Sequence, residues 1–69
     1  MPLTLAAEGE EVVVKKLNGL PEVKQHLEDM GFVPGGAVTV VSKNDGNLIV
    51  KVKESRLAVS KELAAKIMI

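Results

Sequence analysis

The chain of 69 residues contains no cysteine, no tryptophan and no tyrosine, and Phe32 is its only aromatic residue. Without cysteine, neither a disulfide framework nor a thiolate zinc site can hold the fold together. One aromatic residue is too few to line a groove for proline-rich peptides or to stack single-stranded nucleic acid. Stability must therefore come from aliphatic packing, and the hydrophobic fraction of 46% supplies the residues for it.

The charges show no excess of either sign. Nine basic and nine acidic residues cancel, so the chain has no long-range field that would attract nucleic acid or an anionic bilayer. No apolar run approaches the roughly 20 residues needed to span a membrane, and the N-terminus lacks the features of a signal peptide. We expect a cytoplasmic protein that is not membrane-inserted, binds no nucleic acid and forms a single domain over residues 1–69.

One short helix is predicted from Pro21 to Met30. Val23, Leu27 and Met30 recur at i, i+4 and i+7, and Pro21 occupies the first helical position, which proline favours. Such a short helix does not persist alone. We expect its apolar stripe to dock on a sheet.

A sharp corner follows this helix. Gly31 is placed where a left-handed residue closes a helix, and Pro34 prevents the helix from resuming. Phe32 is expected to fold back onto Leu27 or Met30. The glycine pair at 35–36 allows a second bend before the next strand.

The remaining chain alternates apolar and polar residues with the period of β-strands. Strands are expected at 11–17, 38–43, 48–53, 56–59 and 67–69, and residues 3–6 should form an edge strand or an ordered arm. Asp45-Gly46 between two strands predicts a hairpin with a type I′ turn. Ser60 is expected to cap a final helical turn.

These elements predict a mainly β fold. A small SH3-like barrel of five to six short strands accommodates them, with one short helix after the first long strand and a helical turn near the C-terminus, because closure removes exposed sheet edges. An open sheet with two helices on one face is the alternative.

No pattern typical of an enzyme is present, so we expect no catalytic activity and no required cofactor. Glu22, His26 and Asp29 share one flank of the predicted helix and could hold Fe²⁺ or another divalent transition metal. A small metal-binding protein is thus an alternative function. The solvated face of an ordinary surface helix gives the same pattern.

The outward face of two predicted strands carries Val41, Ile49, Lys51 and Lys53. An apolar patch with basic flanks of this kind can dock a protein partner. Scattered surface aliphatic residues, with lysines that discourage strand addition, are the alternative interpretation.

Residues 27–35, Leu-Glu-Asp-Met-Gly-Phe-Val-Pro-Gly, resemble the signature L-x-x-M/L-G-h-x-P-G of the FeoA family, the small ferrous iron transport protein A. Residues 54–60, followed by Leu63-Ala64 and Ile67, are similar to the closing segment of that family. The resemblance covers nearly the whole chain. Glu54 departs from it, since glycine is frequent there in the family.

This resemblance implies a cytoplasmic SH3-like accessory protein of ferrous iron uptake. It implies that the chain acts by binding FeoB, the membrane transporter that carries a cytosolic G-protein domain. The residues that match the family's motifs, and are therefore candidates for contact with the partner, are Met30, Gly31, Phe32, Pro34, Gly35, Arg56 and Ala58. The oligomeric state is left open.

Overall fold

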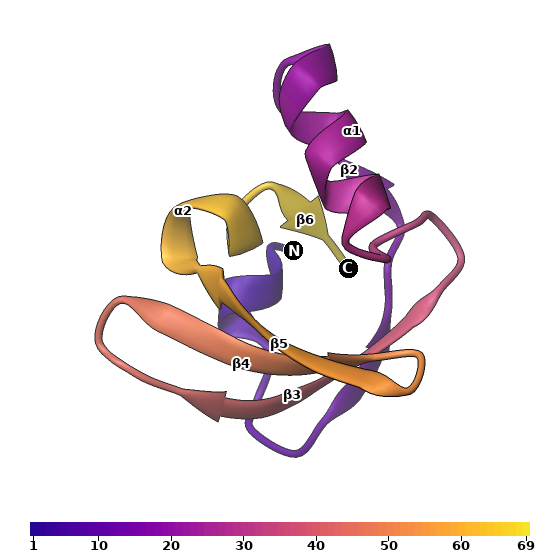
Figure 1. Cartoon of the computed structure of the whole chain (residues 1–69). Coiled ribbons are helices and arrows are strands. Elements are labelled where there is room, and N and C mark those ends of the chain that lie inside the picture. Colours follow the sequence, from indigo (N-terminus) through magenta and orange to yellow (C-terminus); the bar gives the residue numbers. More distant parts are fainter.

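Six strands and three short helices follow one another in the computed structural model, which describes residues 1–69 (Figure 1). In chain order the elements are η1 (Leu3–Leu5), β1 (Glu11–Val13), β2 (Lys16–Leu17), α1 (Pro21–Asp29), β3 (Ala37–Lys43), β4 (Asn47–Val52), β5 (Ser55–Ser60), α2 (Lys61–Ala64) and β6 (Ile67–Met68).

Two antiparallel sheets form the barrel. The larger has the strand order β1-β3-β4-β5, and the smaller pairs β2 with β6. The smaller sheet brings the chain ends together: the backbone N–H of Ile69 donates to the carbonyl of Met1 at 2.7 Å. The predicted mainly β barrel with a helix after the first strands is confirmed.

The first predicted strand, residues 11–17, is divided between the two sheets. The N–H of Val14 donates to the carbonyl of Gly36 at 2.9 Å, and that of Lys15 donates to the carbonyl of Met68 at 2.7 Å. Because these two neighbouring residues bond to different segments, the strand breaks at this point. Local alternation of apolar residues cannot reveal such a change of partner.

The N-terminal segment does not form the edge strand that was one of its two predicted forms, the other being an ordered arm. It forms the 3₁₀ turn η1, in which the N–H of Ala6 donates to the carbonyl of Leu3 at 3.0 Å. Leu3 is fully buried. The turn thus places Leu3 in the core, which an extended arm along the surface would not do.

The hairpin between β3 and β4 is present, but its predicted type I′ turn is wrong. Neither Asp45 nor Gly46 has a positive φ. A register shift between Val40 and Ser42 gives β3 an extra residue, and three residues, 44–46, then connect the strands. The type I′ preference applies to two-residue loops.

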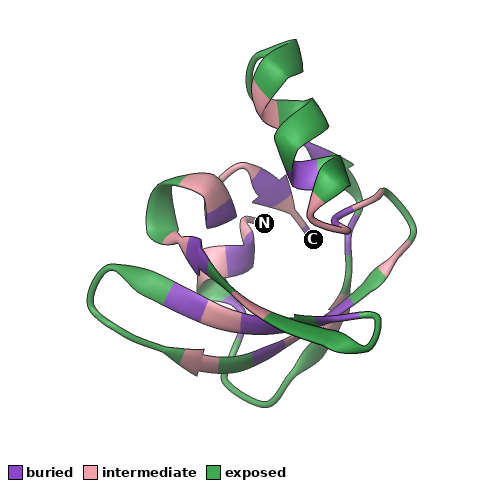
Figure 2. Cartoon of the chain, in the orientation of Figure 1, coloured by how far each residue is buried: buried purple, intermediate pink, exposed green.

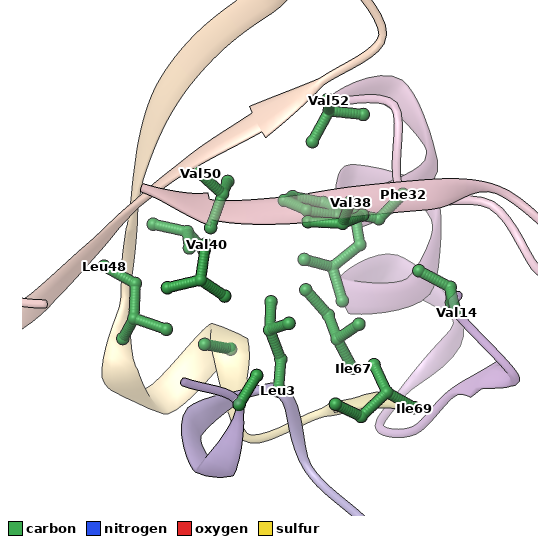
Figure 3. Packing of buried hydrophobic residues seen from close by; sticks show 14 of the residues in the cluster. Leu3, Val14, Phe32, Val38, Val40, Leu48, Val50, Val52, Ile67 and Ile69 are labelled. Carbon is green, nitrogen blue, oxygen red and sulfur yellow. The ribbon is translucent and has the colours of Figure 1, made fainter. Parts of the chain in front are cut away.

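The core is entirely apolar. It receives side chains from every helix and from every strand except β1. Its 15 buried residues include Phe32, Leu27, Val38 and Val50 (Figure 3). The alternating apolar residues of the strands predicted at 38–43 and 48–53 are among them, namely Val38, Val40, Leu48, Val50 and Val52. The sequence pattern therefore identifies the buried faces correctly.

Helix α1 buries only Leu27 fully in this core, and Val23 and Met30 pack against it as partly buried residues. Figure 2 shows the helix projecting from the barrel with most of its surface exposed. The apolar stripe of the helix is thus buried most deeply in its last turn, at Leu27.

Candidate functional site

The corner after α1 is built by a Schellman motif. The N–H of Phe32 donates to the carbonyl of Leu27 at 3.0 Å, and the N–H of Gly31 donates to the carbonyl of Glu28 at 2.9 Å. These are the two hydrogen bonds that define the motif, and Phe32 and Leu27, both fully buried, make its customary hydrophobic contact. The predicted helix stop is confirmed in detail.

Gly31 also fixes the corner against the barrel. Its φ of +108° lies in the region that favours glycine. A Cβ atom at this position would lie 2.9 Å from Cγ1 of Val52, in β4. The absence of a side chain therefore lets the corner lie directly on the end of β4.

The tip of the corner is exposed but held by the backbone. The N–H of Gly35, whose φ is +88°, donates to the carbonyl of Val14 at 2.7 Å. The N–H of Gly36 donates to the carbonyl of Val33 at 2.9 Å. Pro34 and Gly35 thus present an exposed surface of defined shape.

The corner residues matched to the family differ in accessibility. Pro34 and Gly35 are exposed, and Met30 and Gly31 are half-buried. Phe32 is 0% exposed, so its side chain cannot contact a partner in this fold. Its role is to anchor the corner, which corrects its inclusion among the contact residues.

Arg56 and Ala58 lie on the outer face of β5 and are both exposed. Arg56 is directly opposite Lys51 in β4, and Ala58 is opposite Ile49. Lys51 and Lys53 line a shallow hollow on the same face, together with Glu11, Ala37 and Thr39. The structure thus joins Arg56 to the lysines that the sequence had placed on a separate patch.

The corner and the start of β5 are neighbours. Gly31 packs against Val52, and Val52 is paired with Ser55, the residue before Arg56. Figure 1 shows the loop after α1 and the turn between β4 and β5 on the same side of the molecule. Gly31 and Ser55 thus both adjoin Val52, while the exposed tip at Gly35 bonds to Val14.

The carboxylates and imidazole proposed as metal ligands do not assemble into a site. Glu22, His26 and Asp29 are all exposed on α1, and no group of three or more His, Cys, Asp and Glu side chains is arranged to hold a metal ion. Asp29 instead accepts a hydrogen bond from Nε2 of Gln25 at 2.9 Å. Helical spacing placed the three residues on one flank without bringing their side chains together.

An apolar hollow near the chain ends escaped the sequence reasoning. Met1, Val12, Val13, Lys15 and Ile69 line it, and Val13 is 55% exposed. The run of three valines at 12–14 was the available signal, since alternation cannot bury all three on one face.

In the outward patch predicted on the strands at 38–43 and 48–53, Val41 is exposed and Ile49 is half-buried.

No helix in the structure has both the length and the apolar character required to cross a bilayer.

Comparison with known proteins identifies the family to which the sequence is similar. The model of the FeoA domain matches residues 1–69. Fe(2+) transport protein A of Methanocaldococcus jannaschii is 40% identical over 68 residues, which cover 99% of this chain and 83% of that protein.

Solved structures agree with the sequence match. The crystal structure of an iron uptake regulatory protein, FeoA, superposes with a TM-score of 0.90 at 28% identity, covering 97% of this chain and 91% of the other. The zinc complex of Stenotrophomonas maltophilia FeoA, described as a procaryotic SH3 domain protein, gives 0.87 at 26% identity, covering 99% and 87%. The fold is therefore SH3-like, and the chain belongs to the FeoA family.

Proposed function

We propose that this chain is a non-catalytic accessory protein of ferrous iron uptake, which binds the cytosolic surface of a FeoB-type transporter. Family membership supports the link to iron transport, because the relative from M. jannaschii is named as an Fe(2+) transport protein. Binding, rather than chemistry, is the activity that the described surface suits. The chain would act in the cytoplasm.

The packing of Gly31 on Val52 is the observation that carries this proposal. Gly31 and Ser55, the residue before Arg56, both adjoin Val52. We propose that the exposed tip of the corner, Pro34 and Gly35, and the exposed start of β5 with Arg56 serve together as the contact surface. These are the two parts of the chain that match the family's motifs. A contact surface made from both is larger than either part alone, and it spans residues that are far apart in the sequence.

This surface is also preorganised. Gly31, Phe32, Gly35 and Gly36 each donate a backbone hydrogen bond that shapes the corner, and Phe32 anchors it in the core. A partner that binds a segment already held in place loses less conformational entropy on association. We propose that the corner supplies shape and that Arg56 supplies charge.

Calorimetric titration of the chain with the cytosolic domain of the transporter, with and without guanine nucleotide, tests the proposal. Pro34→Ala and Arg56→Glu should each weaken binding, by about threefold to tenfold for losses near 1 kcal/mol. Pro21→Ala and Lys16→Glu are matched controls, since they make the same changes at exposed positions away from this surface. Unchanged affinity in both test variants would refute the assigned surface, and no binding by the parent chain would refute the function.

We propose that the interaction requires no metal. The three helix residues considered as ligands form no metal-holding group, although the S. maltophilia relative was solved with zinc. Repeating the titration in EDTA should leave the affinity unchanged. Loss of binding in EDTA, restored by Fe²⁺ or Zn²⁺, would contradict this statement and revive the metal-binding alternative.

A further inference from the structure

Strand β5 ends the larger sheet without a neighbour on its outer side. The strand order is β1-β3-β4-β5, and the only strand paired with β5 is β4. In other SH3-like or barrel arrangements a closing strand would cover such an edge. Here the smaller sheet is made by β2 and β6 alone, so the edge of β5 stays open.

The alternation of hydrogen bonds shows which groups this edge presents. The backbone N–H of Val40 donates to the carbonyl of Glu10 on the β1 side. Because neighbouring residues of a strand direct their backbone groups to opposite sides, those of Thr39 face its partner Lys51 in β4. The backbone N–H and C=O of Lys51 therefore point toward β3 and away from β5. Its partner Arg56 accordingly directs its own backbone N–H and C=O away from β4.

Ala58, two residues after Arg56, also directs its backbone N–H and C=O away from β4. None of the backbone hydrogen bonds outside the regular elements uses the N–H or C=O of Arg56 or Ala58. Both residues are exposed. Four backbone groups are therefore available to an incoming strand, in the spacing that antiparallel or parallel pairing requires.

Three cationic side chains lie beside this edge, and the acidic Glu54 lies between Lys53 and Ser55 in the adjoining turn. Arg56 lies directly opposite Lys51, and Lys53 lines the same face. Like charges opposite each other in a sheet repel. None of the three side chains makes a hydrogen bond within the protein, so an anionic side chain placed next to Arg56 would relieve this repulsion.

We infer that the free edge of β5 binds an extended acidic segment of a protein partner by strand addition. The segment would carry an acidic residue opposite Arg56 and an aliphatic residue opposite Leu57, whose half-buried side chain faces the core side. Main-chain pairing supplies affinity in this mode, and the alternating side chains supply specificity. The inference rests on the proposed function, for which it names the mode of recognition.

A second copy of this chain fits the edge less well. Pairing β5 with β5 of another molecule would bring two sets of the same three cations onto one face, and Lys61 follows at the end of the strand. This repulsion is the reason why we assign the edge to an acidic partner.

Amide hydrogen exchange and ¹⁵N–¹H spectra give a direct test, with a synthetic peptide of four Glu-Val repeats as the probe. In the free protein the amides of Arg56 and Ala58 should exchange fast, while those of Leu57 and Val59, which face β4, are protected. The peptide should shift and protect Arg56 and Ala58. A peptide of four Lys-Val repeats should do neither, and added salt should weaken the acidic peptide's effect.

Two variants separate strand addition from other contacts. Ala58→Pro removes the outward N–H, which no ladder bond to β4 uses, and proline is tolerated on an edge strand. It should reduce peptide binding about tenfold or more, while Ala58→Val, which keeps the N–H, should not. Arg56→Glu should abolish the preference for the acidic peptide, and Lys16→Glu should preserve it. Retained protection of Leu57 and Val59 confirms that each variant is folded.

The outcomes distinguish this inference from the proposed function. If the transporter's cytosolic domain binds Ala58→Pro as well as the parent chain, and the acidic peptide leaves Arg56 and Ala58 unprotected, strand addition is overturned while the function stands. If the peptide protects both amides but the transporter domain does not bind, the function is overturned while the edge assignment stands. Protection of both amides that rises with protein concentration alone would show that a second copy occupies the edge, and would overturn the acidic partner.

Discussion

Replacing Gly31 by alanine should destabilise the protein more than alanine at any other glycine. The residue has a φ of +108°, and a Cβ atom there would lie 2.9 Å from Cγ1 of Val52. A left-handed conformation costs a non-glycine residue about 1–2 kcal/mol, and forcing a methyl group into a packed core adds about 1–3 kcal/mol. Val52 is only 4% exposed, so it cannot swing into solvent. We expect a loss of about 2–5 kcal/mol.

That loss is a large share of the total stability. A domain of this length has about 3–10 kcal/mol of unfolding free energy, and each 1 kcal/mol lowers the Tm by about 4–8 °C. The Tm should therefore fall by roughly 8–40 °C. Because the chain lacks tryptophan and tyrosine, unfolding is best followed by far-UV circular dichroism or calorimetry.

Two other glycines divide the effect into its parts. Gly35 has a φ of +88° but nothing within 4 Å of a built Cβ, so Gly35→Ala should show only the conformational cost. Gly46 has open space and no positive φ, so Gly46→Ala should be neutral or slightly stabilising. The pair Gly31→Ala and Val52→Ala should couple favourably, since the smaller residue makes room. Equal losses at 31 and 35, or no coupling, would refute the tight contact.

Three further predictions concern stability and are measured by the same unfolding experiments. Phe32→Ala should cost about 3–5 kcal/mol because the ring is fully buried, whereas Phe32→Leu, which refills most of the space, should cost less than half as much; a loss below about 1 kcal/mol for Phe32→Ala would deny the ring its anchoring role. Ser60→Ala should cost about 1 kcal/mol, since Oγ of Ser60 accepts from the N–H of Leu63 at 3.2 Å, and Ser60→Asp should retain most of the stability. Lys53→Gly should raise stability by up to about 1 kcal/mol because Lys53 has a φ of +58°; a loss would show that its lysine chain stabilises the turn.

The parts of the fold that depend on neighbouring residues were predictable from the sequence. The start of α1 at Pro21, its end at Gly31 and the cap at Ser60 each depend on a few adjacent residues. The same holds for the buried faces of β3 and β4, which follow simple alternation. Local chemistry decides these features, so local patterns reveal them.

Features set by distant partners were not predictable in this way. The break after Val13 depends on which segment bonds to Val14 and Lys15, and the turn after β3 depends on the register shift near Val41. Lys53 has a positive φ in the turn between β4 and β5, whereas the sequence pattern predicted left-handed residues in the other hairpin. Pairing between strands decides each of these outcomes.

The candidate site likewise contains residues that the sequence placed correctly and a residue that it did not. Motif resemblance selected Pro34, Gly35, Arg56 and Ala58, all of which are exposed. It also selected Phe32, which is buried, because a motif does not distinguish residues that shape a surface from residues that form it. The contact between Gly31 and Val52, which holds the corner against β4, joins residues that no sequence pattern connects.

The open edge of β5 shows where the expectation of a closed barrel was too simple. Closure was expected to remove sheet edges, but the larger sheet still ends at β5 because β2 and β6 pair only with each other. Natural proteins commonly protect such an edge with cations, which discourage pairing between identical copies. Arg56 beside Lys51 meets that need, and the same two charges favour an anionic strand. A single arrangement of residues would thus oppose self-association and select an acidic partner.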